Sequence, residues 1–110
     1  MNTENAPIVS TLADEGAAII KLILLFIDKL PEIFSEIRDL SEQEEWEALQ
    51  PKVHSLKGTG GNFGFLEITE VARSLEDSIR TRDTASVENL LKELDIIFQR
   101  VAAGRASYPQ

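Results

Sequence analysis

Residues 46–64 read WEALQPKVHSLKGTGGNFG, and their apolar side chains recur at the spacing of one helix face. The apolar positions are Trp46, Leu49, Val53, Leu56 and Phe63, with Gly60 in the same register. The segment also holds the only histidine of the chain, followed by a lysine three residues later and by glycines four and seven residues later. Side chains at these offsets lie beside one another on a helix. The segment therefore predicts an amphipathic helix that carries an imidazole next to a cation and to bare backbone.

The rest of the chain has the same helical periodicity. Residues 19–27 are apolar nearly all round, and residues 30–40 carry a single apolar stripe. Pro31 falls between these two stretches and is expected to kink or divide them, because proline lacks an N–H and clashes with the preceding turn. Two further stripes predict helices over residues 68–79 and 87–101. No alternating strand pattern of convincing length occurs.

Four amphipathic segments joined by short polar links predict an all-α, antiparallel up-and-down four-helix bundle. We expect one domain over residues 1–110 with its core at about 11–103 and with flexible ends at 1–6 and 104–110. The segment 7–12 is compatible with a short extra N-terminal helix. Ser41 followed by Glu44 is a capping-box signature, Asp83 or Thr84 can cap the last helix, and Gly64 can close the helix that holds the histidine.

Composition excludes several classes of function. The 110 residues include no cysteine and carry a net charge of −8, which argues against disulfides, thiolate metal sites and nucleic acid as a partner. Residues 1–7 do not resemble a signal peptide, and the apolar stretch 17–27 is too short to span a bilayer. We therefore expect a cytoplasmic monomer without a membrane partner. Met1 and the polar tail favour a free-standing protein over an excised domain.

The histidine is expected to face solvent. At about 100° per residue, His54 points roughly 130° away from the core direction of its helix. Gly61 lies within roughly 20° of the histidine direction, Gly58 within roughly 40°, and Lys57 roughly 60° away on the side of the core. A helical glycine costs about 1 kcal/mol relative to alanine. Gly60 is explained if a neighbouring helix approaches closely, whereas Gly58 and Gly61 suggest a surface that must stay clear.

The motif from His54 to Gly64 resembles the signature of histidine-containing phosphotransfer (HPt) domains of bacterial and plant-type phosphorelays. The matching residues are His54, Leu56, Lys57, Gly58, Thr59, Gly60, Asn62, Phe63 and Gly64. The resemblance extends over roughly residues 11–103 and includes the proline-containing run 26–32 and the approach 46–49. Three positions depart from the usual pattern: Thr59 replaces alanine or serine, Phe65 replaces a small residue, and Pro51 removes a helix hydrogen bond one turn before the histidine.

The resemblance implies a phosphoryl carrier in two-component signalling. His54 would attack, through Nε2, an aspartyl phosphate on a response-regulator receiver domain and pass the group to a second receiver, with a hybrid sensor histidine kinase upstream. Lys57 would offset the charge of the phosphoryl oxygens. Gly58 and Gly61 would leave room for the receiver, while Leu56, Asn62, Phe63 and Gly64 would support the motif. The resemblance implies no cofactor or metal in this chain, because the Mg²⁺ is held by the receiver. It also implies no autokinase activity.

Other functions compete with this interpretation. A solvated surface histidine and a poorly formed helix end would explain the motif without any chemistry. A helical adaptor that binds receiver or kinase domains without being phosphorylated would share the fold. A small enzyme with His54 as general base lacks an orienting carboxylate between Lys52 and Leu66. A domain of a chemotaxis-type kinase would be a variant of the carrier.

Overall fold

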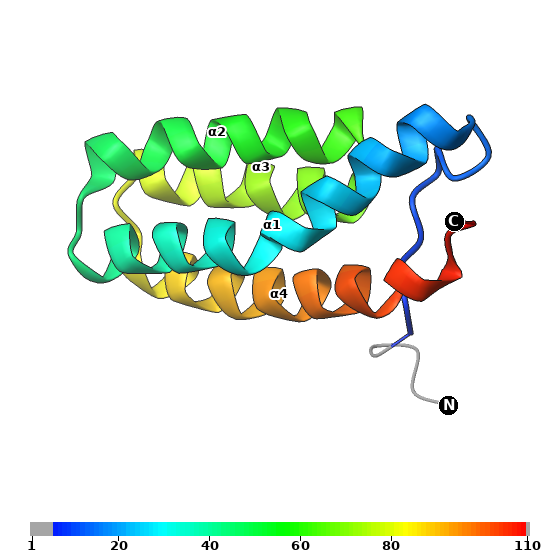
Figure 1. Ribbon diagram of the computed structural model, residues 1–110. Coiled ribbons are helices and arrows are strands. Elements are labelled where there is room, and N and C mark those ends of the chain that lie inside the picture. The colour runs from blue at the N-terminus through cyan, green and yellow to red at the C-terminus, as the bar shows by residue number, and fades with distance from the viewer. Residues whose placement is uncertain (1–5, 110) are drawn as a thin grey trace.

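The computed structural model describes residues 6–109. It contains four α-helices and a short 3₁₀ helix, and no strand occurs within this range. Their bounds are α1 Ala17–Glu42, α2 Trp46–Asn62, α3 Leu66–Arg80, α4 Thr84–Ala103 and the 3₁₀ helix η2 Arg105–Ser107. The predicted fold class is confirmed, since each helix packs against the next and α1 closes on α4 (Figure 1). Within residues 6–109, no helix has the length and apolar character needed to cross a bilayer.

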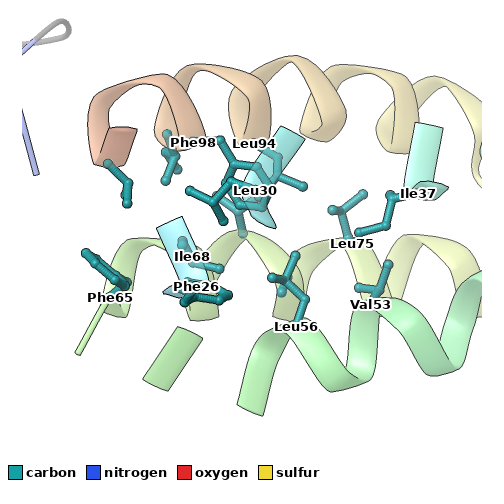
Figure 2. Packing of buried hydrophobic residues seen from close by; sticks show 14 of the residues in the cluster. Phe26, Leu30, Ile37, Val53, Leu56, Phe65, Ile68, Leu75, Leu94 and Phe98 are labelled. Atoms are coloured by element: carbon teal, nitrogen blue, oxygen red, sulfur yellow. The ribbon is translucent and has the colours of Figure 1, made fainter. Parts of the chain in front are cut away.

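The core lies along the axis of the bundle, where the apolar stripes of all four helices meet. Figure 2 shows Leu94 and Phe98 of α4 above Leu56 and Val53 of α2, with Leu30 of α1 between these layers. Because each stripe repeats every three or four residues, one face of each helix is buried and the opposite face is exposed. The exposed faces then become the surface on which a site can form.

Pro31 bends helix α1 without dividing it. The helix α1 runs continuously from Ala17 to Glu42 with Pro31 inside it, and Figure 1 shows that it changes direction near its middle. The missing proline N–H removes one hydrogen bond, and burial of Ile27, Leu30 and Ile37 on either side keeps both halves helical.

The predicted capping box at Ser41 and Glu44 is wrong. Ser41 lies in the last turn of α1, and Glu44 adopts a left-handed φ of 54° in the turn that follows. Helix α2 begins only at Trp46, after Glu45, with no side-chain cap. The apolar stripe of α1 continues through Leu40, which packs on the core, so the helix extends past the serine.

The other two predicted helix ends match the structure. The Asp83 carboxylate accepts a hydrogen bond from the Ser86 backbone N–H at 3.1 Å and caps α4. Gly64 has a φ of +79°, and the N–H of Phe65 donates to the Gly60 carbonyl at 2.8 Å. This arrangement closes α2 with a left-handed residue, a conformation that glycine adopts without strain.

Both ends of the described chain pack against the bundle, which corrects two expectations. Residues 104–109 are not a frayed tail, because Tyr108 is 4% exposed and its hydroxyl accepts a hydrogen bond from the Ser10 N–H at 2.8 Å. Residues 7–12 form an extended segment and a turn rather than a helix. Ile8 packs in the core, where apolar burial and the hydrogen bond from its N–H to the Arg100 carbonyl stabilise the segment. Residues 1–5 and 110 lie outside the described range.

Candidate functional site

The His54 ring faces solvent from the middle of α2. Its side chain is 68% exposed, while Val53 and Leu56 on the opposite side of the helix are buried in the core. This orientation follows from the helical spacing, which turns the histidine away from the apolar stripe. The ring is therefore accessible to a partner protein.

A carboxylate from the next helix holds the imidazole. Nδ1 of His54 lies 2.6 Å from Oε2 of Glu76 on α3. An ionised carboxylate only accepts hydrogen bonds, so Nδ1 must carry the proton that it donates. In the neutral ring this leaves Nε2 unprotonated, with its lone pair available. Glu76 thus selects the tautomer in which Nε2 carries a free lone pair.

Lys57 binds the other oxygen of the same carboxylate. Its Nζ donates to Oε1 of Glu76 at 2.6 Å, and its side chain is 27% exposed. The sequence places Lys57 beside the histidine, and the structure adds that its ammonium is bound to Glu76. An ammonium group has three N–H donors, so two remain for another acceptor.

The ion pair keeps Glu76 ionised. The hydrogen bond from Lys57 holds the pKa of the Glu76 carboxyl below its ordinary value, partial burial opposes this effect, and the bond from His54 adds to it. The Glu76 side chain is only 17% exposed, so water screens its contacts less than it would at an open surface. The three side chains therefore form a network with a fixed negative charge behind the ring.

Glycines next to the histidine have different structural roles. A Cβ at Gly58 would have no neighbouring heavy atom within 4 Å, so this position is open, as predicted. A Cβ at Gly60 would approach Cγ2 of Ile68 to 2.8 Å, which supports the expected close packing of a neighbouring helix. Gly61 differs from the expectation of a clear surface without packing, because its Cβ would touch Oγ1 of Thr69 at 3.4 Å.

Thr69 is a second residue of α3 that contacts α2 near the histidine. Its hydroxyl donates to the backbone carbonyl of Lys57 at 2.9 Å, which joins α3 to α2 one turn from the histidine. Together with the contact of Gly60 and Ile68, this bond fixes the spacing of the two helices. The close spacing lets the short side chain of Glu76 reach across to α2.

The remaining motif residues support the helix rather than the ring. Leu56 is buried, and Asn62 ends α2 in an exposed position. Phe63 is partly buried and stacks on Phe26 with ring centroids 5.1 Å apart. Phe65, which stands where the family pattern has a small residue, is fully buried in the core.

The loss of the helix hydrogen bond that Pro51 removes does not divide α2. Helix α2 continues through this residue without interruption.

Sequence reasoning missed Glu76. No acidic residue lies between Lys52 and Leu66, and the structure supplies the orienting carboxylate from α3, 22 residues after the histidine. A signal existed: His54 and Glu76 are equally far along the chain from Phe65, in the turn between two antiparallel helices. Such a hairpin brings residues equidistant from its turn to the same level. Among the described residues, no three His, Asp or Glu side chains gather as a metal site requires.

Comparison with known protein families identifies the family to which this fold belongs. The model of the Hpt domain matches residues 21–104, which include all four helices except the first turn of α1. The chain belongs to the Hpt domain family. Hpt domains are phosphotransfer carriers of two-component signalling rather than classical enzymes, and they interact with receiver domains in phosphorelays. Comparison with curated proteins and with solved structures gave no match.

Proposed function

We propose that His54 is the phosphoacceptor of this Hpt domain, taking a phosphoryl group from a receiver-domain aspartyl phosphate and returning it to the aspartate of a second receiver. The observation that carries the proposal is the hydrogen bond from His54 Nδ1 to Glu76 in an otherwise exposed ring. It provides an oriented nucleophile that a large partner can reach.

In the forward step, the lone pair of Nε2 forms the N–P bond. The P–O bond of the acyl phosphate breaks, and its electron pair leaves on the aspartate carboxylate. The Nδ1 proton stays between the ring and Glu76, whose negative charge compensates the positive charge that the ring gains. The reverse step forms an acyl phosphate on the second receiver by the same path.

Lys57 and Gly58 assist the transfer in different ways. The two free N–H donors of the Lys57 ammonium offset the charge of the phosphoryl oxygens, while its third bond to Glu76 holds it beside the ring. The open position at Gly58 admits the partner's loops. Phosphoryl transfer passes through a loose transition state that depends on positioning and charge, so these few groups are sufficient.

The proposal assigns the remaining components to partners. The Mg²⁺ used in transfer belongs to the receiver, and the phosphoryl group enters the relay from a hybrid sensor histidine kinase, because this chain is proposed to have neither nucleotide site nor autokinase activity. We further propose that the protein works as a cytoplasmic monomer.

The test is incubation of the protein with a receiver domain charged from radiolabelled acetyl phosphate. The proposal predicts an acid-labile, alkali-stable label on the wild type and none on His54→Gln, with unchanged helical circular dichroism. A label that persists on the variant would refute His54 as acceptor. Complex formation without label on the wild type would instead support the adaptor.

A further inference from the structure

One arginine of this chain differs from the others in having no partner. Arg73 of α3 is exposed, and within residues 6–109 its guanidinium makes no hydrogen bond and has no carboxylate at ion-pair distance. The other arginines all have partners: Arg38, Arg80 and Arg105 pair with carboxylates, Arg100 donates to the Ala6 carbonyl, and Arg82 lies over the Trp46 ring. A guanidinium carries five N–H donors in a fork that fits a carboxylate or a phosphate. Arg73 is therefore free to bind an anion.

Arg73 lies next to the network that holds the histidine. It precedes Glu76 by three residues, a spacing that places two side chains beside each other on a helix, and Glu76 binds both His54 and Lys57. Arg73 and Lys57 are equally far along the chain from Phe65, so the α2–α3 hairpin brings them to the same level. At about 100° per residue, Arg73 points about 140° away from the core direction of α3, on the side of Glu76, which lies at about 80°. The arginine therefore belongs to the same outer surface as the histidine ring.

The carboxylates that neighbour Arg73 on α3 do not neutralise it. Glu76 uses one oxygen for His54 and the other for Lys57. Asp77 is paired with Arg80. Glu70, three residues before Arg73, lies about 60° further from the α2 side by the same helical step, and no ion pair joins the two. The positive charge of Arg73 therefore remains without a counter-charge at contact distance.

The network around the ring lacks positive charge for a phosphoryl group. When Nε2 is phosphorylated, the Glu76 carboxylate compensates the positive charge that the ring gains. The Lys57 ammonium then remains to offset a phosphoryl group that carries close to two negative charges at neutral pH. The whole chain has a net charge of −8, which adds to the repulsion. A second cation at the level of Lys57 corrects this imbalance.

We infer that the Arg73 guanidinium binds the phosphoryl oxygens of phospho-His54 and so stabilises the phosphorylated form of the domain. This inference rests on the proposed function and adds a residue to it, since Lys57 acts from α2 and Arg73 from α3. Two parallel hydrogen bonds from the guanidinium fork can reach two oxygens of one phosphoryl group, an arrangement that a lysine does not offer. Arg73 therefore shifts the transfer equilibrium from the receiver toward His54.

The test measures the equilibrium constant of transfer between a receiver domain and His54, taken from the rates of forward and reverse transfer. It compares the wild type with Arg73→Gln and Arg73→Lys. Arg38→Gln is the matched control, because this arginine is 49% exposed, lies on α1 and pairs with Asp39. The pKa of the phosphoryl group is measured in parallel by phosphorus NMR. For this purpose the protein is phosphorylated with phosphoramidate, a small donor that reacts with an exposed histidine without a receiver.

We expect Arg73→Gln to shift the equilibrium about threefold toward the receiver, as loss of one exposed ion pair does. It should also raise the pKa of the phosphoryl group, because a nearby cation favours the dianion. Arg73→Lys, which keeps the charge, should recover part of both effects, and Arg38→Gln should match the wild type. Wild-type values of both quantities in Arg73→Gln would overturn the inference, as would equal changes in Arg73→Gln and Arg38→Gln.

A third pattern would place Arg73 against the partner instead. If Arg73→Gln raises only the receiver concentration for half-maximal transfer, with the equilibrium and the phosphoryl pKa unchanged, the guanidinium binds a carboxylate of the receiver and the inference is wrong. Failure of the wild type to be labelled by either phosphoramidate or a phosphorylated receiver would refute the proposed function itself, and this inference with it.

Discussion

Oε2 of Glu76 lies 2.6 Å from Nδ1 of His54, so a residue of α3 sets the proton position of a ring on α2. The same carboxylate binds Lys57 through its other oxygen. In the proposed transfer Glu76 is a positioning residue: it acts through the imidazole and the ammonium, which it binds, rather than on the phosphoryl group.

Glu76→Ala should leave the ring accessible while removing its orientation. Without an acceptor at Nδ1, the proton is shared between both ring nitrogens, and Nε2 is unprotonated in only part of the molecules. We expect transfer to slow by about tenfold, because only molecules with an unprotonated Nε2 can attack and the ring is no longer held in one orientation. Imidazole nitrogen NMR should show a single tautomer in the wild type and a mixture in Glu76→Ala. Glu76→Gln, which keeps an oxygen acceptor, should restore most of the single tautomer.

Lys57→Ala should slow transfer without preventing it, because Nε2 and its orienting carboxylate remain. The measurement is the transfer rate at saturating receiver, with Lys92→Ala on α4 as the control. A double-mutant cycle with Glu76→Ala should give a non-zero coupling, since both residues share one hydrogen bond. Additive effects would mean that the ion pair has no part in transfer.

Gly58 and Gly60 should respond oppositely to alanine. A Cβ at Gly58 meets open space, so Gly58→Ala should stabilise the fold by about 1 kcal/mol through helix propensity. A Cβ at Gly60 would collide with Ile68, so Gly60→Ala should destabilise it by about 1–3 kcal/mol. Urea unfolding measures both.

A larger side chain at Gly58 tests whether a partner needs open space there to reach the His54 ring. Gly58→Phe should fold and yet block transfer from a receiver, while phosphoramidate still labels His54. Normal transfer from the receiver to Gly58→Phe would contradict the proposal that open space at this position admits the receiver.

The contribution of Glu76 to stability should depend on pH in a defined direction. Its pKa in the folded protein lies below the ordinary 4.5. Its ion pair therefore stabilises the fold fully above that value, and this contribution is lost as the pH falls through the lowered folded pKa. Glu76→Gln should cost about 1 kcal/mol at neutral pH, and this difference should shrink as the pH falls below the ordinary pKa of 4.5.

Urea unfolding of wild type and Glu76→Gln across this pH range measures the effect. Glu70→Gln, at an exposed position of the same helix, is the control and should show little difference at any pH. A difference for Glu76→Gln that grows on acidification would contradict the assigned direction of the pKa shift.

Much of the fold follows from local pattern. The helices were predictable because their apolar residues repeat at helical spacing, and the exposure of His54 follows from the same geometry. Asp83 and Gly64 were predictable because caps act within one turn. The predicted capping box at Ser41 was wrong, because burial of the apolar stripe of α1 stabilises the helix more than a local cap would stabilise a new one. The packing of the two chain ends against the bundle was not predicted, because Ile8 and Tyr108 are held by contacts with residues distant in sequence.

Glu76 could not be recognised from local pattern, because it is one of several acidic residues on a polar helix face. Only its level in the antiparallel hairpin, opposite His54 across the α2–α3 turn, distinguishes it from Glu70 and Asp77. The exposure of Leu22 and Leu25 was equally hard to predict, since both lie in a stretch that is apolar nearly all round. Which residues of this stretch remain exposed depends on how α1 packs against the other helices.

The most direct measurement is the position of the phosphoryl group in the isotope-labelled protein, read from phosphorus–nitrogen couplings by NMR after transfer from a receiver. The account predicts one phosphoryl group, on Nε2 of His54, with the Nδ1 proton still bound to Glu76. A phosphoryl group on Nδ1 or on any other residue would contradict it.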